Sequence, residues 1–120
     1  MEMSNISRVS DYKELDTTLD LALLKNSVFV GKASGHSMQG LGIFCGDILL
    51  IDRAVKCNHG DVIVVTYNGQ FVCKIIDMKK NRLISASEDY QPIEITEFDT
   101  LQYEGAVTAS IRMHRPSSHL

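Results

Sequence analysis

Short runs of apolar residues, many of them alternating with polar ones, follow one another along most of the chain, a pattern typical of β-strands. We expect strands at residues 28–33, 47–53, 61–67, 70–77, 82–86 and 101–113. The last of these carries Gly105 and is expected to break near it. No repeat or low-complexity tract interrupts the pattern, which predicts a mainly β domain of curled sheets over residues 28–114.

The first 27 residues follow a different pattern. Residues 1–14 are polar and mixed, and we expect a flexible arm there. Thr17 or Thr18 is suited to cap a short helix that runs from residue 19 to residue 25. The leucines of this helix are expected to dock on the domain rather than on a partner. At the other end, residues 115–120 form a tail, because the proline in it cannot continue a strand.

A hairpin is predicted around Asn68 and Gly69, because a type I′ turn needs positive φ at both central positions and this pair adopts it readily. A two-residue loop fixes the register of its strands, so Ile63 is expected opposite Lys74. Side chains alternate across a strand, which places Lys74 on one apolar face and Cys73 on the other. We therefore expect both faces of the hairpin to be covered.

The position of Lys74 among apolar residues allows two interpretations. Burial disfavours the charged form of lysine and lowers its pKa, from about 10.4 to roughly 5–6 in fully buried groups. A neutral amine beside a serine hydroxyl is a general base, a role that arginine cannot fill. In the other interpretation, the side chain extends past the strand edge and keeps its ammonium in water.

A serine that such a base would serve lies 37 residues upstream, in residues 34–38 (SGHSM). Glycines punctuate the loop from Gly31 to Asp47 and let its backbone approach a peptide closely. Such a loop suits a nucleophile, Ser37, whose neighbouring amides must face a developing oxyanion. An ordinary Gly/Ser loop has the same composition, so the segment alone does not decide between the two.

Several blocks of sequence resemble a known family. They are residues 32–38 (KASGHSM), 46–52 (GDILLID), 59–64 (HGDVIV), 71–74 (FVCK), 87–93 (SEDYQPI) and 103–107 (YEGAV). In this order and spacing, the chain resembles the LexA/UmuD family of self-cleaving Ser-Lys peptidases over residues 28–112, and within it the UmuD branch. The resemblance implies the fold of the LexA/UmuD C-terminal domain.

The resemblance also implies roles for individual residues. Ser37 matches the nucleophile, Lys74 matches the general base, and the backbone amides of His36 and Ser37 match the oxyanion hole. The histidine is a departure, since the family has an acidic or apolar residue there, and we expect His36 to face solvent without a catalytic role. Met38 is expected to anchor the loop. No cofactor or metal is implied.

Members of this family cut themselves at an Ala-Gly or Cys-Gly bond upstream of the domain. The first glycine of this sequence is Gly31, so no such bond precedes the serine loop. The pair Cys45-Gly46 lies after the nucleophile, where a cut would destroy the domain. We therefore expect the chain to correspond to the processed form or to a homologue encoded short. A dyad without its own substrate can still cut another copy in trans, but cleavage need not be the function of this chain.

Composition narrows the classes of function. A net charge of −3 argues against direct binding to duplex DNA. Three cysteines and four scattered histidines show neither a disulfide framework nor the spacing of a zinc site. No secretory signal or apolar run of membrane-spanning length is apparent. Together these features indicate a cytoplasmic protein that neither enters a membrane nor binds specific DNA sequences directly. The resemblance implies that its cytoplasm is bacterial.

Two functions are compatible with the resemblance. In the first, the chain is an accessory subunit of an error-prone translesion DNA polymerase in the bacterial SOS response. It would then be a homodimer that binds a UmuC-like Y-family polymerase and a RecA filament. In the second, it is a free-standing self-cleaving domain of the LexA or phage-repressor type. The apolar face that alternation gives residues 101–113 serves either as core or as a dimer interface.

Overall fold

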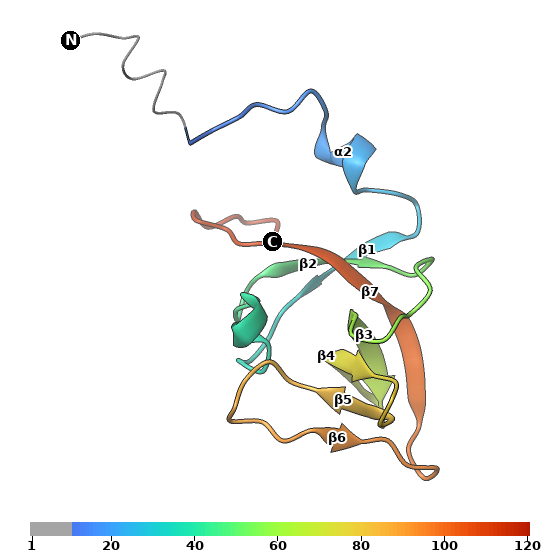
Figure 1. Ribbon diagram of the computed structural model, residues 1–120. Helices are drawn as coiled ribbons and strands as arrows, with labels where there is room; N and C mark the ends of the chain where they lie inside the picture. Colours follow the sequence, from blue (N-terminus) through green and yellow to red (C-terminus); the bar gives the residue numbers. More distant parts are fainter. Residues whose placement is uncertain (1–10) are drawn as a thin grey trace, which may run out of the picture.

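A computed structural model describes residues 11–120 of the chain. Its seven strands form one antiparallel sheet in the order β1-β2-β7-β3-β4-β5-β6, and the long β7 curves along one side of the domain (Figure 1). The strands are β1 (Val28–Lys32), β2 (Ile48–Asp52), β3 (Val62–Tyr67), β4 (Gln70–Asp77), β5 (Arg82–Ile84), β6 (Ile93–Glu94) and β7 (Leu101–Ile111). The predicted mainly β fold with one short helix is confirmed.

The strands differ from the sequence expectation in two places. The two-residue strand β6 was not predicted, because a segment that short carries no periodicity. Strand β7 is continuous through Gly105 instead of breaking there. Its register shifts against β3 between Val64 and Val65 and against β2 between Leu50 and Ile51. The expected break is therefore a pair of bulges, which bend a strand without ending it.

The helix is shorter than predicted. Helix α2 covers only Leu19–Ala22, with Thr18 as its N-cap residue accepting a hydrogen bond from the amide of Leu21. None of its residues is buried, so the expected docking of its leucines on the domain is wrong. A single turn has few backbone hydrogen bonds to offset the cost of nucleation, and without packing it does not extend. Most of the predicted flexible arm lies outside the described residues.

The Asn68-Gly69 hairpin has the predicted geometry. Both turn residues have positive φ, 48° and 85°. The register pairs Tyr67 with Gln70 and Ile63 with Lys74, as a two-residue loop requires. The two faces of the hairpin pack against separate clusters of apolar side chains, so both faces are covered as expected.

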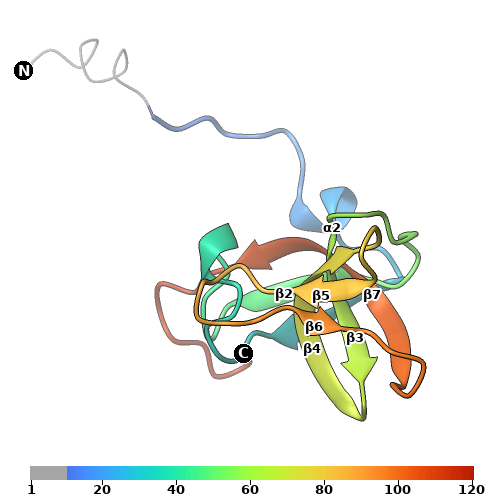
Figure 2. The same cartoon turned by 60° about the horizontal axis from the view of Figure 1, so that its bottom comes forward.

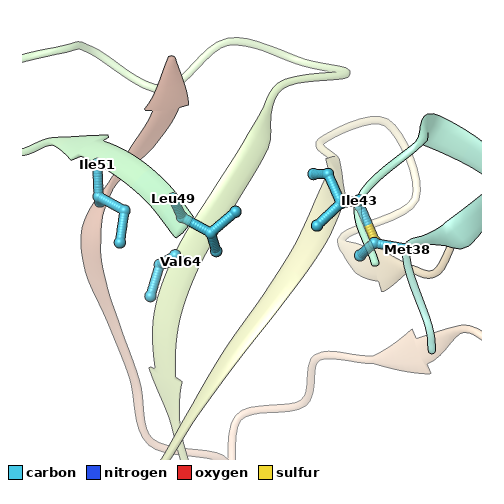
Figure 3. Close-up of a cluster of buried hydrophobic side chains, with 5 residues drawn as sticks. All are labelled: Met38, Ile43, Leu49, Ile51 and Val64. Atoms are coloured by element: carbon cyan, nitrogen blue, oxygen red, sulfur yellow. The ribbon is translucent and has the colours of Figure 1, made fainter. Parts of the chain in front are cut away.

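The two apolar clusters lie on opposite faces of the hairpin. The first cluster joins the serine loop to β2 and β3, and its buried members are Met38, Ile43, Leu49, Ile51 and Val64 (Figure 3). The second cluster lies on the face of β3 and β4 that also carries Lys74, and its buried members are Ile63, Val65, Ile76 and Leu83. Within residues 11–120, no helix has the length and apolar character needed to cross a lipid bilayer.

Candidate active site

The serine loop is held in place by apolar anchors. Ser37 lies between β1 and β2, just before the 3₁₀ helix η1 (Gln39–Leu41). The next residue, Met38, is 4 % exposed and packs into the first cluster, as expected from the sequence, together with Ile43. Burying these side chains on both sides of η1 fixes the loop against β2 and β3.

Lys74 reaches the same region from β4. Its side chain is only 8 % exposed, although lysine is almost never buried without a partner. The hairpin register places it opposite Ile63 on the face of the second cluster. The burial of Lys74 confirms the sequence inference that this lysine points among apolar side chains.

A groove of about 440 Å³ connects the two residues. Ser37 and Lys74 both line it, and its floor is the first cluster of Figure 3. Its walls come from β1, the serine loop and the start of β4. The other side chains that line it are mostly apolar: Phe29, Ala33, Phe71, Val72 and Cys73. A concave, mostly apolar surface with a few polar groups has the character of a ligand-binding site.

The ammonium of Lys74 has two neighbours from the segment that follows β5. Its Nζ donates a hydrogen bond to Ser85 Oγ at 2.8 Å and lies 5.2 Å from the centre of the Tyr90 ring. Among the hydrogen bonds of residues 11–120, none joins Lys74 to Ser37. The structure thus brings Ser37 and Lys74 to one groove, in which the Lys74 amine is hydrogen-bonded to Ser85.

Burial lowers the pKa of Lys74, and the neighbouring Cys73 opposes this change. No salt bridge of the described residues includes Lys74, so no carboxylate stabilises its charge. The thiol of Cys73 lies in the same groove, and burial raises its pKa to about 11, an effect that the charge of Lys74 partly offsets. At neutral pH this thiol stays protonated and is a poor nucleophile.

Two backbone amides at the serine are available to a ligand. Within the part of the chain that the structure describes, the N–H groups of His36 and Ser37 donate no hydrogen bond. The His36 side chain is exposed and its Nδ1 lies 2.8 Å from Gln39 Nε2. The His36 side chain faces solvent, as expected from the sequence.

Metal and disulfide chemistry have no counterpart in the described residues. Between residues 11 and 120, no group of three or more His, Cys, Asp or Glu side chains is arranged to hold a metal ion. The three cysteines are free, and Cys45 is exposed.

Sequence reasoning did not identify Ser85 and Tyr90 as parts of this site. Tyr90 belongs to a block quoted for the resemblance, but its place over Lys74 depends on the path of the chain after β5. The place of Ser85 could be read only from the observed strand pairing. Strand β5 pairs Ile84 with Ile75, and one further step of that register sets Ser85 opposite Lys74. Directly opposed side chains on one face of a sheet lie within contact distance.

Comparison with known proteins identifies a matching family and several relatives. The family model of the Peptidase S24-like family matches residues 2–108. The chain is 29% identical over 110 residues to the protein ImpA of Salmonella typhimurium, covering 90% of this chain and 72% of ImpA. It is 30% identical over 112 residues to the protein SamA of Salmonella typhimurium strain LT2, covering 91% of this chain and 78% of SamA.

A repressor is also among the similar proteins. The LexA repressor of Syntrophotalea carbinolica is 32% identical over 89 residues, which cover 72% of this chain and 44% of the repressor. The family match and these relatives confirm the resemblance to the LexA/UmuD type that the sequence blocks indicated.

Proposed function

Because the chain belongs to the Peptidase S24-like family, we propose that it is a Ser-Lys peptidase with Ser37 as nucleophile and Lys74 as general base. The observation that carries this proposal is the burial of Lys74 in the same apolar groove as Ser37, without a carboxylate partner. Such an environment favours the neutral amine, the form that accepts a proton.

The proposed reaction is acyl transfer. As neutral Lys74 takes the hydroxyl proton, Ser37 Oγ bonds to the carbonyl carbon of the scissile peptide. The unengaged amides of His36 and Ser37 donate to the resulting oxyanion. When the intermediate collapses, the C–N bond breaks and Lys74 returns the proton to the leaving amine. Water then attacks the acyl-enzyme with the same assistance, releasing the new carboxylate and restoring Ser37.

The biological role follows from the relatives. We propose that the chain is a homodimeric accessory subunit of an error-prone translesion polymerase in the bacterial SOS response, with a UmuC-like Y-family polymerase and a RecA filament as partners. The similarity to ImpA and SamA extends over 90% and 91% of this chain and supports the accessory subunit. In this role the protein is expected in the bacterial cytoplasm.

Cleavage in trans tests the peptidase proposal. The substrate is an uncleaved UmuD-type protein with an Ala-Gly or Cys-Gly bond upstream of its domain and alanine in place of its own nucleophile. We expect this chain to cut that bond at alkaline pH and to stay intact itself. Ser37→Ala is expected to cut none of it, because no hydroxyl remains to attack the carbonyl, and mass spectrometry of the products measures both results.

The matched control is Ser110→Ala, an exposed serine on β7 that does not line the groove. This variant should cut at the wild-type rate. Cleavage that persists in Ser37→Ala would contradict the mechanism. A wild-type chain that fails to cut the substrate would contradict peptidase activity in trans.

Light scattering tests the proposed dimer. At micromolar concentration we expect roughly twice the chain mass of 13.4 kDa. Met113, 44 % exposed at the end of the alternating apolar face, is a suitable position for a disruptive charge. Met113→Glu should lower the measured mass towards the monomer, whereas Ser110→Glu on the opposite face should not. A strictly monomeric wild-type chain would argue against the accessory subunit and favour the isolated peptidase domain.

A further inference from the structure

The segment that leaves β5 contacts both members of the proposed dyad. The side chain of Ser85 accepts the hydrogen bond from Lys74 Nζ at 2.8 Å. The next residue, Ala86, donates its amide to the carbonyl of Ser37 at 2.7 Å. Figures 1 and 2 show the connection between β5 and β6 passing beside the serine loop. Two adjacent residues therefore connect the base and the backbone of the nucleophile.

The contact with the serine loop is tight on its other side as well. Ala86 also accepts a hydrogen bond from the amide of Gly40 at 2.6 Å. A Cβ atom added at Gly40 would lie 2.5 Å from the Ala86 carbonyl oxygen, so this approach requires glycine. The segment is thus fastened to the loop before and after Met38, and its position sets where Ser85 stands relative to Ser37.

From these contacts we propose that Ser85 is a positioning residue that orients the amine of Lys74 for the reaction at Ser37. The inference rests on the proposed Ser-Lys mechanism. A neutral amine has two N–H donors and one lone pair. With one N–H engaged by Ser85 Oγ, rotation about the last side-chain bond is restricted and the lone pair is left for the hydroxyl of Ser37. The effect on catalysis is one of orientation.

Other groups around Lys74 do not replace this role. The Tyr90 ring interacts with a cation over its face but offers no fixed acceptor. Cys73, the adjacent residue of β4, is the only titratable group among the described residues that alters the pKa of Lys74 through its charge. Lys32, the other cation that lines the groove, donates to the backbone carbonyl of Leu120.

The test compares two substitutions of nearly equal shape. Ser85→Thr keeps the hydroxyl, whereas Ser85→Val replaces it with a methyl group. On the alkaline plateau, where Lys74 is neutral in every variant, we expect Ser85→Val to cut the trans substrate about tenfold more slowly, because the amine loses the hydrogen bond that orients its lone pair. Ser85→Thr should recover most of the rate. Ser87→Ala, which removes a neighbouring hydroxyl that accepts from the amide of Asp89, should match the wild type.

A second readout does not depend on peptidase activity. Lys74 can be labelled with an amine-reactive acetylating reagent, and peptide mass spectrometry follows the labelling rate across pH. Because only the neutral amine reacts, the midpoint of this profile reports the pKa of Lys74. Without the acceptor at Ser85 the ammonium is less stable, so the labelling midpoint of Ser85→Val should lie about one pH unit below that of Ser85→Thr. Thermal unfolding of both variants verifies that they are folded.

Each outcome has one meaning. A Val variant that labels and cuts like the Thr variant would overturn the positioning role. If no variant cuts the substrate but the labelling midpoint of the Val variant still shifts, the proposed peptidase function fails while the interaction at Lys74 stands. An equal loss in Thr and Val would also overturn the inference, because the shape of the side chain and not its hydroxyl would then be responsible.

Discussion

Lys74→Arg should cut the trans substrate about 10²–10⁴-fold more slowly than the wild type, the range by which general bases accelerate proton transfer. Arginine is similar to lysine in length but stays protonated, so it cannot take the proton of Ser37. The rate of product formation under excess enzyme measures the loss. Because arginine keeps a positive charge at this position, a slower rate reports the loss of the base and not the loss of the charge.

Lys80→Arg is the matched control, because Lys80 is exposed in the turn after β4. It should cut at the wild-type rate. Both variants should unfold in one cooperative urea transition. A Lys74→Arg variant that is folded and retains the wild-type rate would show that this lysine is not the base.

Leu83→Ala should lower the free energy of unfolding by about 2–5 kcal/mol, the usual cost of truncating a fully buried leucine. Leu83 is 0 % exposed and packs in the second cluster with Ile63, Val65 and Ile76. Removing it leaves a cavity between β3, β4 and β5. Urea unfolding, with the free energy extrapolated to water, measures the change.

Met78→Ala is the comparison for this variant, since Met78 lies just after β4 and is 50 % exposed. Its loss should stay below about 1 kcal/mol, as for most exposed positions. Equal destabilisation by the two substitutions would mean that the second cluster is not a tightly packed core.

The features of the site that could be predicted from sequence depend on residues close together in the chain. The Asn68-Gly69 turn sets the register by itself, and that register alone decides which face Lys74 occupies. Ser37 was recognised through the family resemblance, because its loop alone has the composition of an ordinary Gly/Ser loop. The way Met38 anchors the loop was likewise foreseeable, because an apolar residue amid glycines has few other uses.

The part that could not be predicted depends on longer connections. Strands β4 and β5 are joined by four residues with positive φ at Asn81, and no short turn motif dictates the pairing that sets Ser85 opposite Lys74. The predicted helix failed for a related reason. Its leucines read as an apolar face, but only tertiary packing would have stabilised more than the single turn at Leu19–Ala22.

The central claim is that neutral Lys74 is the base for Ser37, and its pH dependence follows from burial. Burial lowers the pKa of Lys74, so the active, neutral form accumulates as the pH rises through a value below that of an exposed lysine. The cleavage rate should therefore rise with pH and level off above that value. Protonation of Lys74 at lower pH should remove the activity.

The most direct test measures two profiles on the same wild-type protein: the rate of cleavage in trans and the rate of acetylation of Lys74, both against pH. The account predicts that the two profiles share one midpoint, below the ordinary lysine value of about 10.4. A cleavage rate that is independent of pH, or whose midpoint differs from that of Lys74, would contradict it.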